Sequence, residues 1–245
     1  MTHGMSFERS ARARTLTAAV AAFFIAVPAI AQPQTCPPEG DATQALAREL
    51  NPFKNRQDAP PVEKINPAAT LSAVLAPGED LNRWSRDSGA IFEGVVVGVK
   101  VGGIESVNCH AHDALHRDTH IELALDAGAP SRQRVIVEVT PHLRQEMAVI
   151  ADWSTSALKK QLLNHRVRIT GWMFDDLEHR PQAENSNPGG ASNWRASVWE
   201  IHPVTGIVVL DQAANTASPE VGRATSNAPI RHHRRKHVRR ARRHR

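Results

Sequence analysis

Five carboxylate and imidazole side chains stand at strand-like spacing between residues 118 and 202. Asp118 and His120 are two residues apart. Glu200 and His202 repeat this spacing, and Glu138 lies in a segment between the two pairs. Residues two apart on a strand project from the same face, so three strands can bring all five side chains together. Such groups bind divalent metals and act as general acids and bases. They are the candidate catalytic residues of a metal-dependent, phosphodiesterase-like hydrolase.

The same residue types also fit roles without catalysis. They can form a hydrogen-bonded polar network that closes one end of a barrel, or they can lie on a solvated face of a sheet. Glu178 and His179 would lie on a nearby loop. None of these residues follows a metal-ligand motif of known spacing, so an enzyme is the less favoured interpretation.

A second group of histidines lies close together in the sequence. His110, His112, His116 and His120 fall within one loop-like segment that begins at Cys109. Together they can hold zinc or copper. The chain has 13 histidines, however, so a gathering without a metal is the alternative. No cofactor is predicted beyond a possible divalent metal.

Alternating apolar residues predict the strands that would position these side chains. The five predicted strands are residues 91–101, 119–126, 134–140, 165–174 and 194–203, with residues 204–210 extending the last one beyond a kink at Pro203. In the second strand Ile121, Leu123 and Leu125 would face the core. In the third strand Val137 would face the core and Glu138 the opposite side. In the fifth strand Trp199 and Ile201 would pack inward, so Glu200 and His202 would share the other face.

One helix is predicted between the third and fourth strands, over residues 156–163, with Ser154 as its N-cap. Three strands, one helix and two strands is the element order of an OB-fold, a small Greek-key barrel. Residues 163–172 also resemble the helix-to-strand junction of many OB domains. The predicted fold class is therefore mainly β, an OB-fold-like five-stranded barrel with disordered ends, although other five-strand topologies exist.

Residues 91–210 further resemble a group of secreted bacterial proteins that carry an OB-like domain. The resemblance covers about half of the chain and rests on DTHI at 118–121, VEVTP at 137–141, GW at 171–172, EH at 178–179 and WEIHPV at 199–204. It implies an OB-like fold and export from the cell. It implies no reaction.

Nucleic acid is disfavoured as a ligand of the barrel. OB domains that bind single strands stack the bases on aromatic side chains. Residues 119–126 and 134–140 contain no aromatic residue, and the chain has no tyrosine. The five tryptophans stand where packing is their ordinary role, at positions 84, 153, 172, 194 and 199.

The N-terminus predicts a cleavable secretory signal peptide over residues 1–31. Arg9, Arg12 and Arg14 precede an uncharged stretch from Leu16 to Ile30. Small residues then lead to a cleavage site after Ala31. The apolar stretch is too short for a transmembrane span. The mature protein is therefore predicted to be periplasmic or secreted, without a membrane span.

Cys36 and Cys109, the two cysteines of the chain, both follow the predicted cleavage site. In an oxidising compartment a disulfide between them can persist. A pair of free thiols is the alternative, because two cysteines alone do not indicate a disulfide framework.

Charge and composition divide the mature chain into four segments. A Pro-rich, loosely docked arm is predicted over residues 32–80 and the OB-like domain over 81–211. A flexible linker follows over 212–230 and a disordered tail over 231–245. The tail holds nine lysines and arginines and no acid, whereas residues 32–230 hold 18 basic and 24 acidic residues.

The leading functional hypothesis is an exported OB-fold binding module of unknown ligand. Its basic tail would contact anionic polymers. The metal-dependent hydrolase is the alternative.

Overall fold

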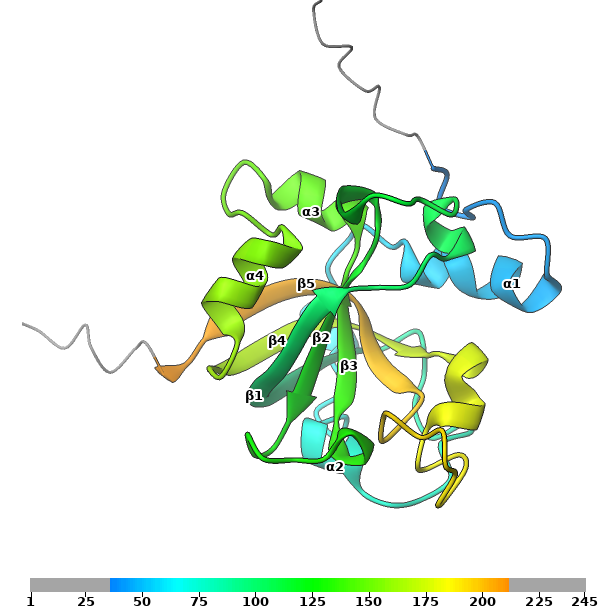
Figure 1. Cartoon of the computed structure of the whole chain (residues 1–245), viewed down its shortest axis with the longest axis vertical. Helices are drawn as coiled ribbons and strands as arrows, with labels where there is room; N and C mark the ends of the chain where they lie inside the picture. The colour runs from blue at the N-terminus through cyan, green and yellow to red at the C-terminus, as the bar shows by residue number, and fades with distance from the viewer. Residues whose placement is uncertain (1–35, 212–245) are drawn as a thin grey trace, which may run out of the picture. The chain divides into compact units, whose positions relative to one another are not determined.

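The structure is a computed structural model that describes residues 36–211. It contains a closed five-stranded barrel in which neighbouring strands follow the order β1-β2-β3-β5-β4 (Figure 1). The strands are β1 (Gly89–Val101), β2 (Thr119–Ala124), β3 (Val135–Val139), β4 (Arg166–Asp175) and β5 (Trp199–Val209). The β3–β5 pair is parallel and the other pairs are antiparallel. The predictions of a mainly β chain and a five-stranded barrel are confirmed. The predicted signal peptide, linker and basic tail concern residues outside the described range.

The helices and short 3-10 turns connect and cover the strands. The α-helices are α1 (Ala45–Lys54), α2 (Leu71–Leu75), α3 (Pro141–Met147) and α4 (Thr155–Leu162). The 3-10 turns are η1 (Val62–Lys64), η2 (Ser106–Asn108), η3 (Ala114–His116), η4 (Ser131–Gln133) and η5 (Leu177–Gln182). Within residues 36–211 no helix is both long enough and apolar enough to cross a bilayer.

Two helices, rather than the single one expected, lie between β3 and β4. The predicted helix is α4, and Ser154 caps it by accepting a hydrogen bond from the amide of Ala157. The additional helix, α3, begins directly after β3. Its N-cap is Thr140, which accepts from the amide of Leu143, and Pro141 occupies its first turn. Proline is favoured at that position because its missing N–H is not needed there, so Pro141 begins a helix as well as ending a strand.

Several strand ends differ from the prediction, most of them by one or two residues. β2 ends at Ala124, and Leu125, which was expected to face the core, is 45 % exposed. The chain turns here, because the amide of Ala129 donates to the carbonyl of Asp126. β5 begins at Trp199 instead of residue 194, and it continues through Pro203 to Val209.

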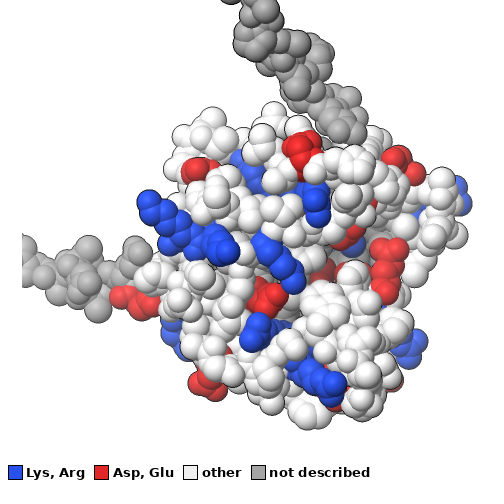
Figure 2. Space-filling model, viewed as in Figure 1, with Lys and Arg blue, Asp and Glu red and all other residues white. Residues whose placement is uncertain are grey.

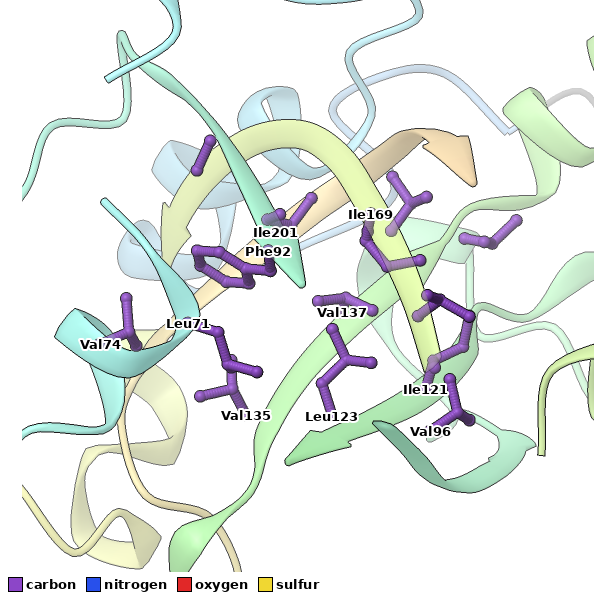
Figure 3. Packing of buried hydrophobic residues seen from close by; sticks show 14 of the residues in the cluster. Leu71, Val74, Phe92, Val96, Ile121, Leu123, Val135, Val137, Ile169 and Ile201 are labelled. Carbon is purple, nitrogen blue, oxygen red and sulfur yellow. The ribbon is translucent and has the colours of Figure 1, made fainter. Parts of the chain in front are cut away.

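The barrel interior holds the main hydrophobic core. Val137, Ile201 and Phe92 are fully buried there, and Figure 3 shows side chains of several strands meeting at this point. Leu158 and Leu162 of α4 belong to the same core. The apolar positions that alternate along β2 and β3 thus face inward as predicted, because a side-chain period of two sends them all to one face.

Residues 36–80 are part of the folded domain and not the loosely docked arm that was expected. Leu50 of α1 and Val74 of α2 are fully buried, and Val74 belongs to the barrel core. A disulfide joins Cys36 to Cys109. Gly40 has a φ of +61°, and a Cβ there would lie 2.0 Å from the Ser106 carbonyl oxygen, so the chain approaches η2 too closely for a side chain. Many prolines hide the apolar spacing of this segment, which explains the error.

Candidate functional site

The strand register brings the five predicted carboxylate and imidazole residues to one region. His120 lies opposite Glu138 in the β2–β3 pair. Val137 lies beside Ile201 in the parallel β3–β5 pair, and both face the core. Their neighbours Glu138, Glu200 and His202 therefore face the other side of the sheet.

All five side chains are buried on that side. Asp118, His120, Glu138, Glu200 and His202 are each at most 7 % exposed. A solvated sheet face, one of the expected alternatives, is thereby excluded. Burial of charged groups is tolerated when they are paired and hydrogen-bonded, and the surroundings of these residues supply such partners.

Two buried cations, neither of them predicted from the sequence, compensate the carboxylates. Lys54 Nζ, at the end of α1, lies 2.9 Å from Glu105 Oε2. Arg195 Nη2 lies 2.6 Å from Glu200 Oε2. A third carboxylate, Asp176, lies 3.5 Å from Arg195 Nη1. We use the name polar cluster for these residues together with the five predicted ones and His179. Its ten members are Lys54, Glu105, Asp118, His120, Glu138, Asp176, His179, Arg195, Glu200 and His202.

The pKa values in the polar cluster follow from burial and from close partners. Burial disfavours the charged imidazole of His120, but the Glu138 carboxylate, 3.1 Å from His120 Nε2, outweighs it and raises the His120 pKa to about 9. Burial would raise the pKa of Glu138, but His120 and His202 lower it to about 2. The pKa of Asp118 shifts in the other direction. Burial raises it more than the attraction of His202 lowers it, so it reaches about 6.

These shifts predict a loss of stability in mild alkali. The folded protein holds the His120 proton up to a pKa of about 9, whereas the ordinary value is 6.5. The ion pair therefore stabilises the fold fully below pH 6.5, and its contribution, about 3 kcal/mol, is lost as the pH rises toward 9. We expect chemical denaturation in EDTA to show this decline for the wild type and a smaller one for His120→Gln, in which His179 and His202, whose pKa values are also raised, still titrate. His116→Gln, at an exposed histidine, should keep the decline, and an unchanged decline in His120→Gln would contradict the assignment.

The loop histidines do not gather into one site. His110 Nδ1 lies 2.9 Å from Asp41 Oδ1, and His116 Nδ1 lies 2.9 Å from Asp113 Oδ1. His112 is exposed. Within the described part of the chain, the group whose ligand atoms could share a metal is Asp118, Glu138 and His202, without these loop residues.

The two loop residues expected near the cluster lie at its border. His179 Nδ1 is 3.0 Å from Asp176 Oδ2. Glu178 and His179 both line a pocket of about 400 Å³, together with Glu105, His110 and residues of α1. This pocket therefore borders the polar cluster at Glu105 and His179.

A larger groove, of about 940 Å³, lies elsewhere on the barrel. Its walls are α2 with the residues after it, the β2–β3 connection, and residues 184–188 of the β4–β5 connection. α2 lies below the strands in Figure 1, away from α1 and α3. Apolar residues such as Leu75, Leu125 and Pro130 line much of it, and carboxylates stand among them.

Asp80 holds the groove walls together. This buried carboxylate accepts hydrogen bonds from Asn185 Nδ2, Ser186 Oγ and the amide of Val198. Asn185 also donates to the carbonyl of Val74 in α2. The groove is therefore pre-formed, as ligand sites usually are.

The described face in Figure 2 shows no strongly basic surface. Lys and Arg side chains are interspersed with Asp and Glu on it. Neither this face nor the polar cluster resembles a nucleic-acid interface, which carries a clustered positive charge. No function can be carried over from a relative, because no protein-family model and no curated protein matches this chain.

Proposed function

We propose that this chain is an exported OB-type binding module. The strand order supports it, because β5 lies between β3 and β4 as in a Greek-key barrel. The Cys36–Cys109 disulfide agrees with an oxidising compartment outside the cytoplasm. The predicted signal peptide over residues 1–31 and the resemblance to secreted OB-like proteins point the same way.

The groove of about 940 Å³ is the observation that carries the binding function. OB domains bind ligands at the β2–β3 face and at the loops beside it. Here α1 packs against η2 and β5, and its Lys54 pairs with Glu105 in the polar cluster. The groove, bordered by the β2–β3 and β4–β5 connections, stays open to solvent.

The groove lining favours a positively charged, partly apolar ligand such as a basic peptide. Glu79, Asp126 and Glu184 bring three carboxylates to the groove. Arg132, its one lining arginine, is 3.6 Å from Glu184 and also donates to the carbonyl of Gly190. The carboxylates of Glu79 and Asp126 thus remain for the ligand, and Leu125 adds apolar lining to the same groove. No aromatic residue lines the groove, so base stacking is not available there.

A pair of labelled peptides tests this proposal. We expect the full chain to bind a fluorescent nine-residue peptide of alternating lysine and leucine, measured by anisotropy. A peptide of alternating serine and leucine, which carries no charge to attract the basic tail, should bind at least about tenfold more weakly. The double variant Glu79→Gln/Asp126→Asn should weaken the lysine peptide by about tenfold, since it removes about 1.4 kcal/mol of attraction.

The control is Glu146→Gln, which removes an exposed carboxylate on α3, away from the groove. It should bind like the wild type. Equal affinity for the two peptides, or an unchanged affinity in the double variant, would refute the groove as the binding site.

The second candidate function is a metal-dependent hydrolase that acts through Asp118, His120, Glu138, Glu200 and His202. The gathering of these residues around one point favours it. Their burial does not, because a substrate must reach the reacting centre. Hydrolysis of a phosphodiester probe that is lost in Asp118→Asn would establish it.

Residues 231–245 lie outside the described range. For them we propose a separate contact with anionic polymers, supported by nine cationic side chains without an acid.

A further inference from the structure

Seven side-chain nitrogen and oxygen atoms of the polar cluster have no hydrogen-bond partner among residues 36–211, and three of them belong to Asp118, Glu138 and His202. These three are Asp118 Oδ1, Glu138 Oε2 and His202 Nε2. Their residues are at most 3 % exposed. An unpaired buried polar atom costs about 1 to 3 kcal/mol, so three such atoms in one cluster indicate a missing partner.

The hydrogen bonds around these atoms leave them free to bind one ion. Asn108 donates to Asp118 Oδ2, which leaves Oδ1 available. His202 Nδ1 lies 3.1 Å from Glu200 Oε1, and Arg195 fixes this same carboxylate. A histidine whose Nδ1–H is directed at a carboxylate presents a lone pair on Nε2 once Nε2 is deprotonated, as metal binding requires. Carboxylate–histidine pairs of this kind orient the imidazole ligands of metal ions.

The spacing of the three residues fits a single ion. One ligand atom from each of Asp118, Glu138 and His202 lies within 4.8 Å of the other two. Ligands about 2.1 to 2.4 Å from a common ion lie at most about 4.2 to 4.8 Å apart.

The permanent charges of the polar cluster leave room for a cation. Its five carboxylates, Glu105, Asp118, Glu138, Asp176 and Glu200, face two permanent cations, Lys54 and Arg195. The difference, 5 − 2, leaves three negative charges for bound protons or a metal ion to balance.

The pocket of about 400 Å³ borders the polar cluster. Glu105 and His179 line it, and both belong to the polar cluster. An anionic and imidazole-lined pocket attracts cations.

We propose that Asp118, Glu138 and His202 form a binding site for one divalent transition-metal ion of the Zn²⁺ or Mn²⁺ kind. An imidazole with two carboxylates suits these ions, whereas Ca²⁺ and Mg²⁺ prefer oxygen ligands alone. The ion links the start of β2 to β3 and β5 and stabilises their packing. The site is distinct from the groove and does not depend on what the groove binds.

Metal binding to the full chain tests the proposal. After removal of metal with EDTA, Zn²⁺ and Mn²⁺ are added separately, with Ca²⁺ and Mg²⁺ as comparisons. We expect saturating Zn²⁺ to raise Tm by about 5 to 10 °C. Equilibrium dialysis should show one more tightly bound Zn²⁺ in the wild type than in Asp118→Asn or Glu138→Gln. The tail and loop histidines are the same in every chain, so their own metal binding cancels in this difference.

Glu122→Gln is the matched control. Glu122 is also on β2, but it pairs with Lys100 and Arg134 outside the polar cluster, so this variant should keep the additional ion and the Tm increase. Co²⁺ gives a second readout, since its visible absorption reports coordination by an imidazole and carboxylates and should be weaker in Asp118→Asn. Equal metal content in the wild type and Asp118→Asn would overturn the proposal. A wild type that Zn²⁺ and Mn²⁺ do not stabilise would overturn it even if the variants fail to fold.

Discussion

Replacing Arg195 by methionine should lower the free energy of unfolding by about 3 to 5 kcal/mol. Arg195 is 1 % exposed. Its guanidinium is 2.6 Å from Glu200 and 3.5 Å from Asp176, and it also donates to the carbonyl of Ser197. Methionine keeps much of the volume but leaves two buried carboxylates without their nearest permanent cation, and that uncompensated charge causes the loss. Urea denaturation of the full chain measures it.

Two further variants separate charge from packing. Arg168→Met breaks an ion pair with Glu93 in which both side chains are at least 40 % exposed, and it should cost less than about 1 kcal/mol. Arg195→Met/Glu200→Gln should regain about 1 to 2 kcal/mol over Arg195→Met, because one of the stranded charges is gone. If Arg195→Met lost no more stability than Arg168→Met, the pairing of Arg195 with the buried carboxylates would be wrong.

Loss of the Cys36–Cys109 disulfide should destabilise the protein by about 4 kcal/mol. The bridge closes a loop of 73 residues, and the entropy that such a loop removes from the unfolded chain corresponds to about that value. The double variant Cys36→Ser/Cys109→Ser and the reduced wild type should therefore unfold at the same, lower urea concentration.

The single variants Cys36→Ser and Cys109→Ser check the cause. Either one breaks the bridge, so each should lose as much stability as the double variant. If the two single losses were smaller and added up to the double loss, local packing at each cysteine would be responsible instead of the bridge.

Strand alternation was sufficient to predict the centre of the polar cluster. A period of two assigns Glu138, Glu200 and His202 to one face once their strands are recognised. The element order then predicted five strands around one barrel. These signals are local, so the sequence carries them without knowledge of the rest of the fold.

The two buried cations of the polar cluster, Lys54 and Arg195, depend on contacts between distant segments. Lys54 pairs with Glu105, 51 residues later, and nothing near Lys54 in the sequence indicates this. Arg195 stands in a stretch that looks like the start of a strand, although its side chain is fixed by Asp176 and Glu200. The groove was not predicted either, because its walls come from three separate parts of the chain.

Amide hydrogen exchange of the full chain, with and without the lysine–leucine peptide, tests most directly whether the protein binds its ligand in the groove. The account predicts slower exchange with peptide at residues 125–133 and 184–188, and unchanged exchange at residues 137–139 of β3, beside the polar cluster. Unchanged exchange at the groove segments, or protection confined to the polar cluster, would contradict it.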